Sequence, residues 1–78
     1  MPEYVLNTTR QYDEKGKLYY EVHRYPKANC SSPEYPSMDN QRRLGNLNTC
    51  KEALARAEAL GYKQADGCAY CCAECHKK

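Results

Sequence analysis

The sequence predicts a small α+β domain: a β-hairpin packed on one capped helix, followed by a C-terminal cysteine knuckle and a short helix. Three observations carry this prediction. Residues 18–25 alternate between two faces, residues 49–60 begin with a capping motif and carry a stripe of Ala and Leu, and two C-x-x-C units lie back to back near the end. Because 78 residues leave room for only one core, we expect a single domain over residues 1–78.

The predicted hairpin joins residues 4–9 to residues 18–25. The first segment, Tyr-Val-Leu-Asn-Thr-Thr, is rich in β-formers, and a turn signal that ends in a glycine follows at residues 13–16. One face of the second strand carries Leu18, Tyr20 and Val22, and the other carries Tyr19, Glu21, His23 and Tyr25. This alternation is typical of a half-buried strand.

Residues 26–43 are expected to form a long loop, because the composition shifts there to Pro, Ser, Asn and charged residues. A loop of this length needs an anchor at both ends. Residues 44–47, Leu-Gly-Asn-Leu, are a candidate third strand, which would extend the hairpin to a three-stranded antiparallel sheet.

The helix is the clearest local element. Thr49 and Glu52 fit the S/T-x-x-E capping box, in which the two residues satisfy each other's backbone amides. Gly61 is suited to end the helix in a left-handed conformation. The predicted core stripe of the helix consists of Ala53, Leu54, Ala57 and Leu60. Gly67 permits a tight turn into Cys68, and a short helix is expected from Cys71 or Cys72.

Composition indicates that an apolar core alone will not hold this chain together. The large aliphatic side chains are six Leu, two Val and two Met, with no Ile, Phe or Trp. Small chains with so little apolar bulk commonly depend on a metal or on disulfides. A mean hydropathy of −1.00 and the lack of a long apolar run predict no membrane-spanning segment and no membrane partner.

The distribution of the six cysteines favours metal binding over a disulfide scaffold. Cys30 and Cys50 stand alone, whereas the remaining four fall within residues 68–75. Disulfides stabilise most when each closes a loop, which four clustered cysteines do poorly. Residues 1–4 have neither a basic start nor an apolar stretch behind them, so we expect no secretory leader and a cytoplasmic location, where cysteine clusters more often bind metal.

Zinc requires four ligands in a tetrahedron of Cys sulfur and His nitrogen. The first predicted set is His23, Cys30, Cys68 and Cys71. A second candidate set is Cys50, Cys72, Cys75 and His76, which share one face if the residues from position 72 onward are helical. A disulfide from Cys50 to Cys72 or Cys75 is the competing account of the second group.

Several segments resemble the small Ada-type zinc module, which is also found appended to some bacterial nucleases. These are Tyr4-Val5-x-Asn7, Val22-His23, Cys30, Glu52-Ala53, Gly61-Tyr62 and Cys68-x-x-Cys71. The ending of residues 65–76 is similar to that of a group of uncharacterised bacterial proteins that end in A-D-G-C-x-Y-C-C-x-E-C-H. The resemblance implies that His23, Cys30, Cys68 and Cys71 bind one zinc.

The sequence therefore predicts a structural zinc module that presents a surface to a protein partner or binds nucleic acid weakly. The alternative is a redox-active or redox-sensing C-x-x-C protein, since a C-x-x-C at a helix start has a nucleophilic thiol. Twelve basic residues against ten acidic ones give a poor electrostatic footprint for nucleic acid. We expect no enzyme activity, because no catalytic arrangement stands out and four protein ligands leave no open metal position. The oligomeric state is not predicted.

Overall fold

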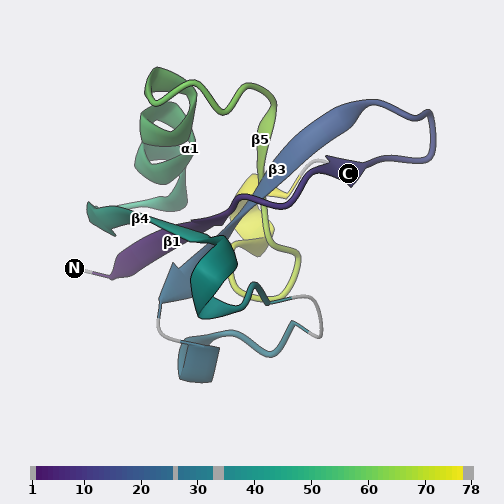
Figure 1. Cartoon of the computed structure of the whole chain (residues 1–78). Helices are drawn as coiled ribbons and strands as arrows, with labels where there is room; N and C mark the ends of the chain where they lie inside the picture. The colour runs from purple at the N-terminus through teal and green to yellow at the C-terminus, as the bar shows by residue number, and fades with distance from the viewer. Residues whose placement is uncertain (1, 26, 33–34, 77–78) are drawn as a thin grey trace.

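The structure, a computed structural model, describes residues 2–25, 27–32 and 35–76. The elements in chain order are β1 (Glu3–Asn7), β2 (Gln11–Tyr12), β3 (Leu18–Tyr25), η1 (Lys27–Asn29), η2 (Met38–Asn40), β4 (Gln41–Asn46), α1 (Cys50–Ala59), β5 (Ala65–Gly67) and η3 (Ala73–Cys75). The strands form one five-stranded sheet in the order β2-β3-β1-β4, with β5 paired to β3 in parallel, and α1 is the single α-helix of the described residues (Figure 1). The predicted α+β class is confirmed. No described helix has the length and apolar character needed to cross a bilayer.

The hairpin forms as predicted, with an interruption in its first arm. β1 pairs antiparallel with β3, so that Leu6 lies opposite Val22, and the strand ends where the Asn7 side-chain oxygen accepts a hydrogen bond from the Thr9 amide at 2.9 Å. The chain then pairs with β3 again through the two-residue β2. At the tip, Gly16 has the positive φ (79°) that the turn requires.

The loop prediction for residues 26–43 was wrong at its end, because β4 already begins at Gln41 and pairs with β1. The polar composition of residues 41–43 is compatible with a strand here because β4 lies at the edge of the sheet, where charged side chains guard against further pairing. The third strand is confirmed, three residues longer toward the N-terminus than residues 44–47 suggested. Gly45 (φ 96°) lies where the β1–β4 register shifts.

Helix α1 has the predicted caps. The Thr49 hydroxyl accepts a hydrogen bond from the Glu52 amide at 3.3 Å, and Gly61 follows the helix with a φ of 100°. The Glu52 carboxylate accepts from the amide of Asn48 at 2.9 Å, one residue before the partner that a strict capping box would use. Leu60, expected on the core stripe, is the C-cap and is 39% exposed, so the buried stripe ends at Ala57.

Replacing the N-cap should weaken the domain measurably. We expect Thr49→Ala to lower the free energy of unfolding by about 1 kcal/mol, because the Glu52 amide loses its acceptor. Urea unfolding followed by circular dichroism measures this change. Thr8→Ala, a threonine outside the helix, serves as the control, and equal losses in the two variants would contradict the assigned cap.

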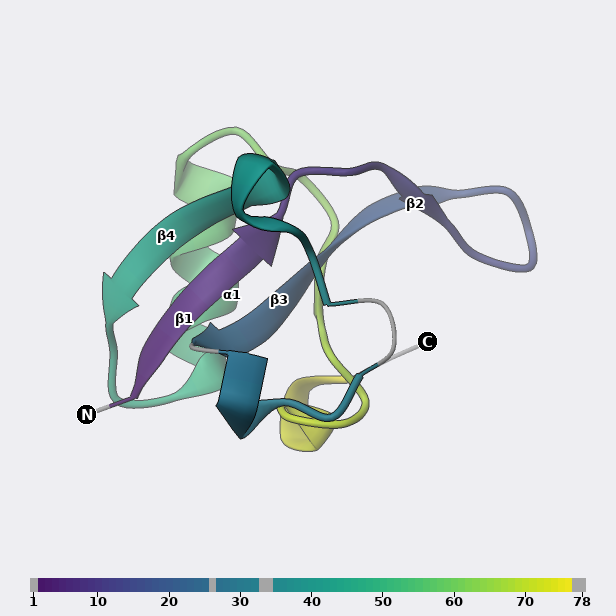
Figure 2. The same ribbon diagram turned by 60° about the horizontal axis from the view of Figure 1, so that its bottom comes forward.

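The sheet separates two layers. Tyr4, Leu6, Val22 and Leu44 belong to the same core cluster as the buried residues of α1. Val5 and His23 lie on the opposite face, since side chains alternate along a strand, and they are fully buried there. Figure 2 shows α1 behind the sheet, with the chain from η1 onward turning back at the end of β3. The second layer is therefore built from the segment after β3 and the turn after β5, and it contains the cysteine–histidine cluster.

Strand β5 has no counterpart among the elements expected from the sequence. Its residues, Ala-Asp-Gly, are weak β-formers, and the strand exists because it pairs with residues 20–22 of β3, far away in the sequence. The pairing continues into the next residue, whose amide donates to the Val22 carbonyl at 2.9 Å. β5 thus delivers Cys68 to the edge of β3 beside His23.

Candidate metal centre

Two of the four clustered residues come from β3 and the turn after it. His23 is fully buried, and its Nδ1 atom lies 3.6 Å from the Cys30 sulfur. Six residues separate the two in sequence, and the single 3-10 turn η1 reverses the chain within that gap. Cys30 is 8% exposed and lies 3.7 Å, sulfur to sulfur, from Cys68.

The other two residues form a tight knuckle. The Cys72 amide donates to the Cys68 carbonyl at 2.8 Å, which closes the turn between the ligand candidates Cys68 and Cys71. Each sulfur accepts a backbone hydrogen bond: Cys68 from Tyr70 at 3.4 Å, and Cys71 from Arg24 at 3.2 Å. Such N–H···S contacts favour thiolate sulfur, the form that binds metal.

The structure brings all four residues of the first predicted set together. One potential ligand atom from each of His23, Cys30, Cys68 and Cys71 lies within 4.8 Å of every other, and three of the four residues are buried. Among the described residues this is the one Cys/His group arranged to hold a metal ion. The cluster could therefore bind a metal, with all four positions supplied by the protein.

The sulfurs of the cluster resist ionisation in the absence of a cation. Burial raises the pKa of the Cys30 thiol to about 12 and also raises that of Cys68. Hydrogen bonding with Cys72, followed by burial, raises the pKa of Cys71 to about 11. Three thiolates this close together would repel one another, so a cation must replace their protons if they are to act as ligands together.

The pKa of His23 is raised to about 9. Burial alone would lower it, but the interactions with the Cys71 sulfur and the Glu21 carboxylate outweigh burial. The Nε2 atom lies 3.1 Å from Glu21 Oε1, off the line of the N–H bond, so this is a close electrostatic contact rather than an aligned hydrogen bond. A carboxylate at this ring nitrogen leaves Nδ1 as the metal-facing atom.

Sequence reasoning missed two residues that support the cluster. Glu21 could have been found, because it lies two positions before His23 on the same face of a predicted strand. Nothing in the sequence of the predicted loop marked Tyr35 as a residue of the site. Its ring lies 5.1 Å from that of His23, and its hydroxyl donates to the Arg24 carbonyl at 3.0 Å. It thus covers the histidine from the outer side.

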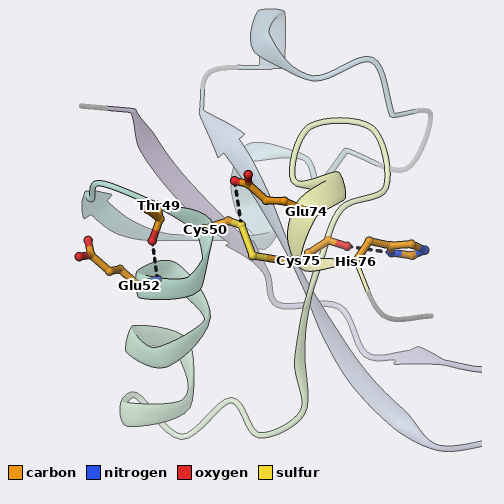
Figure 3. The surroundings of a disulfide bond; sticks show 7 residues. Thr49, Cys50, Glu52, Glu74, Cys75 and His76 are labelled. Carbon is orange, nitrogen blue, oxygen red and sulfur yellow. Dashed lines mark hydrogen bonds between the residues drawn. A yellow bond between two sulfur atoms is a disulfide. The ribbon is translucent and has the colours of Figure 1, made fainter.

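The second candidate metal set does not form. Cys50 and Cys75 are joined in a disulfide, one of the two pairings in the competing account (Figure 3). The physical reason is that η3 is a three-residue 3-10 turn with Cys72 outside it as the N-cap, so the helical face assumed for the set is absent. The Nδ1 atom of His76 instead lies 2.9 Å from the Gly67 carbonyl oxygen and 3.4 Å from the Asp66 carboxylate. Cys72 is a buried free thiol.

Comparison of the chain with protein-family models, with curated protein sequences and with solved structures finds no match. The function is therefore inferred from the geometry of the cluster alone, and the resemblance to the Ada-type module stays a prediction.

Proposed function

We propose that this protein is a structural zinc module, with one zinc bound by His23, Cys30, Cys68 and Cys71. A single observation carries the proposal. In a tetrahedral zinc site with sulfur at about 2.3 Å and nitrogen at about 2.0 Å, the ligand atoms lie about 3.5–3.8 Å apart. The separations of 3.7 Å between the Cys30 and Cys68 sulfurs and 3.6 Å between Cys30 and His23 Nδ1 match that spacing.

The donor set selects zinc among the common metals. Three thiolates and one imidazole suit zinc, whereas magnesium and calcium prefer oxygen ligands. A set of four protein ligands is closed, and closed sites hold a fold together instead of activating water. Because such a site is structural, we propose that the module acts by presenting a surface to another protein. Weak nucleic-acid binding is the alternative. A cytoplasmic location stays a prediction.

The redox alternative finds less support at the C-x-x-C unit. An attacking cysteine needs a lowered thiol pKa, whereas the pKa values of Cys68 and Cys71 are both raised. The unit follows a three-residue strand and does not begin an α-helix, so no helix dipole acts on its first sulfur. Hydrogen bonding with Cys71 lowers the pKa of Cys72, but its C-x-x-C partner Cys75 is already joined to Cys50. An insulin-reduction assay should therefore show no turnover, and measurable turnover would revive this alternative.

Native mass spectrometry of untagged protein under non-reducing conditions tests the proposal. We expect one zinc and one disulfide per chain, and the same spectrum reads the oligomeric state. Protein purified with ample zinc that carries no stoichiometric metal, and whose cluster thiols react freely with a thiol reagent, would overturn the zinc assignment.

The carboxylate beside His23 should tune the affinity for zinc. We expect Glu21→Gln to weaken zinc binding by about 10- to 100-fold, because the imidazole loses the charge that orients it and makes it a stronger donor. Competition with a chromophoric chelator measures the affinity. Glu14→Gln, which removes a carboxylate at the exposed hairpin tip, is the matched control, and an equal effect of both changes would show that only net charge matters.

A further inference from the structure

The Cys50–Cys75 disulfide ties the first residue of α1 to the last residue of η3. Its two cysteines are shielded from water, with exposed fractions of 1% and 4%. Cys75 lies four positions after Cys71, so the disulfide fixes the chain directly behind the knuckle that supplies two of the four ligands.

The turn that carries Cys75 also packs tightly on the residue before Cys68. A Cβ atom on Gly67 would lie 2.6 Å from the Cys72 carbonyl oxygen and 2.8 Å from the Cys75 Cβ, so only glycine fits there. His76 Nδ1 lies 2.9 Å from the Gly67 carbonyl oxygen, which can only accept, so the ring nitrogen donates. The disulfide-bearing turn and the start of the knuckle are thus one packed unit.

The segment of residues 68–76 is held to the rest of the protein at its start, at its far end, and at Cys71 between them, whose sulfur accepts a hydrogen bond from the Arg24 amide. At its start, the Cys68 amide donates to the Val22 carbonyl at 2.9 Å, and at its far end the disulfide joins it to α1. If the disulfide is reduced, the covalent link to α1 is lost, and the residues after Cys71 are held by non-covalent contacts alone. Zinc would then have to order this less constrained segment as it binds, which costs conformational entropy.

We infer that Cys50 and Cys75 form a redox site that sets the zinc affinity of the neighbouring centre, with the oxidised pair giving the tighter site. This inference rests on the proposed zinc function. Because coupling between two sites is reciprocal, bound zinc makes the disulfide harder to reduce by the same factor.

The redox step is an ordinary thiol–disulfide exchange. A dithiol donates two electrons and two protons, the bond between the Cys50 and Cys75 sulfurs breaks, both become thiols, and the dithiol leaves as a disulfide. Oxidation is the reverse reaction, with a low-molecular-weight disulfide such as oxidised glutathione as the acceptor of electrons and protons. Glu74 Oε1 lies 3.2 Å from the Cys50 sulfur, where it can accept a hydrogen bond from the reduced thiol (Figure 3).

A zinc competition titration with a chromophoric chelator tests the coupling. It compares three proteins: the wild type with its disulfide intact, the double variant Cys50→Ser/Cys75→Ser, and Thr49→Ala, which weakens the same end of α1 but keeps the disulfide. We expect the double variant to bind one zinc at least about fivefold more weakly than the other two proteins, which should agree. Equal affinity in the double variant, or an equal loss in Thr49→Ala, would overturn the inference.

A second measurement uses the wild type alone, so that it stands even if the double variant does not fold. The protein is equilibrated in a glutathione redox buffer with and without zinc, and peptide mapping reads the oxidised fraction of the Cys50–Cys75 pair. Zinc should raise the ratio of oxidised to reduced pair by the factor found in the titration, and an unchanged ratio would overturn the coupling while leaving the zinc site intact. Wild-type protein that binds no zinc would refute the proposed function itself, and the first titration shows this without any variant.

Discussion

Cys68→Ser is expected to remove stoichiometric zinc and to abolish the cooperative unfolding transition of the protein. Cys68 is 1% exposed, lies 3.7 Å from Cys30, and starts the knuckle that follows β5. Structural zinc contributes about 10–16 kcal/mol in small zinc domains, comparable to or larger than the roughly 5–15 kcal/mol that stabilises an ordinary domain. With only ten large aliphatic side chains, six Leu, two Val and two Met, the core cannot make up that loss.

The matched control for this variant is Cys72→Ser. Cys72 is also a buried free thiol, 2% exposed, but it lies outside the cluster. We expect it to keep one zinc and to lose only about 1–2 kcal/mol, because the hydroxyl replaces a buried sulfur that is hydrogen-bonded to Cys71. Circular dichroism during thermal unfolding, together with metal analysis, separates the two variants. Retention of zinc and of a cooperative transition by Cys68→Ser would contradict the assigned ligand set.

Gly67→Ala is expected to give the largest stability loss of the single substitutions outside the ligands that we propose. The new methyl group would lie 2.6 Å from the Cys72 carbonyl oxygen and 3.0 Å from the backbone carbon of Cys75, and backbone atoms cannot move aside cheaply. Overpacking of this kind costs about 1–3 kcal/mol, and we expect the upper end because the turn is held by a disulfide. Urea unfolding of the zinc-loaded protein measures the loss.

Gly61→Ala is the control for this substitution, because the two glycines differ in what restricts them. A Cβ on Gly61 would meet nothing within 4 Å, but the residue has a φ of 100°. Gly61→Ala should therefore lower the free energy of unfolding by only about 1–2 kcal/mol, which is the cost of a left-handed backbone for a residue with a Cβ. It should not change zinc binding. Gly67→Ala should in addition weaken zinc binding, since it displaces Cys68. A Gly67→Ala protein with normal zinc affinity would show that η3 and the knuckle are not packed as one unit.

Local signals allowed the helix and the first ligand set to be predicted. The cap at Thr49 and the stop at Gly61 depend only on neighbouring residues, and both are present in the structure. The C-x-x-C knuckle is likewise local, and the alternation of the second strand placed His23 next to the turn that leads to Cys30. These features depend on sequence spacing of a few residues.

Features that depend on distant pairings could not be predicted in the same way. β5 is a strand only because β3 offers a free edge, and nothing in Ala-Asp-Gly indicates it. The choice of Cys75 over Cys72 as the partner of Cys50 depends on whether the last turn is α or 3-10, which three residues cannot specify. The early start of β4 at Gln41 depends on its position at the edge of the sheet, where polar residues are tolerated.

X-ray absorption at the zinc edge of untagged, zinc-loaded protein tests the central claim most directly, because it reads the ligand atoms themselves. We expect three sulfur neighbours at about 2.3 Å and one nitrogen at about 2.0 Å, from Cys30, Cys68, Cys71 and His23. A shell of four sulfurs would mean that Cys72 replaces His23, and a shell of nitrogen and oxygen alone would mean that the cluster is not the site. Either result would contradict the assigned ligand set.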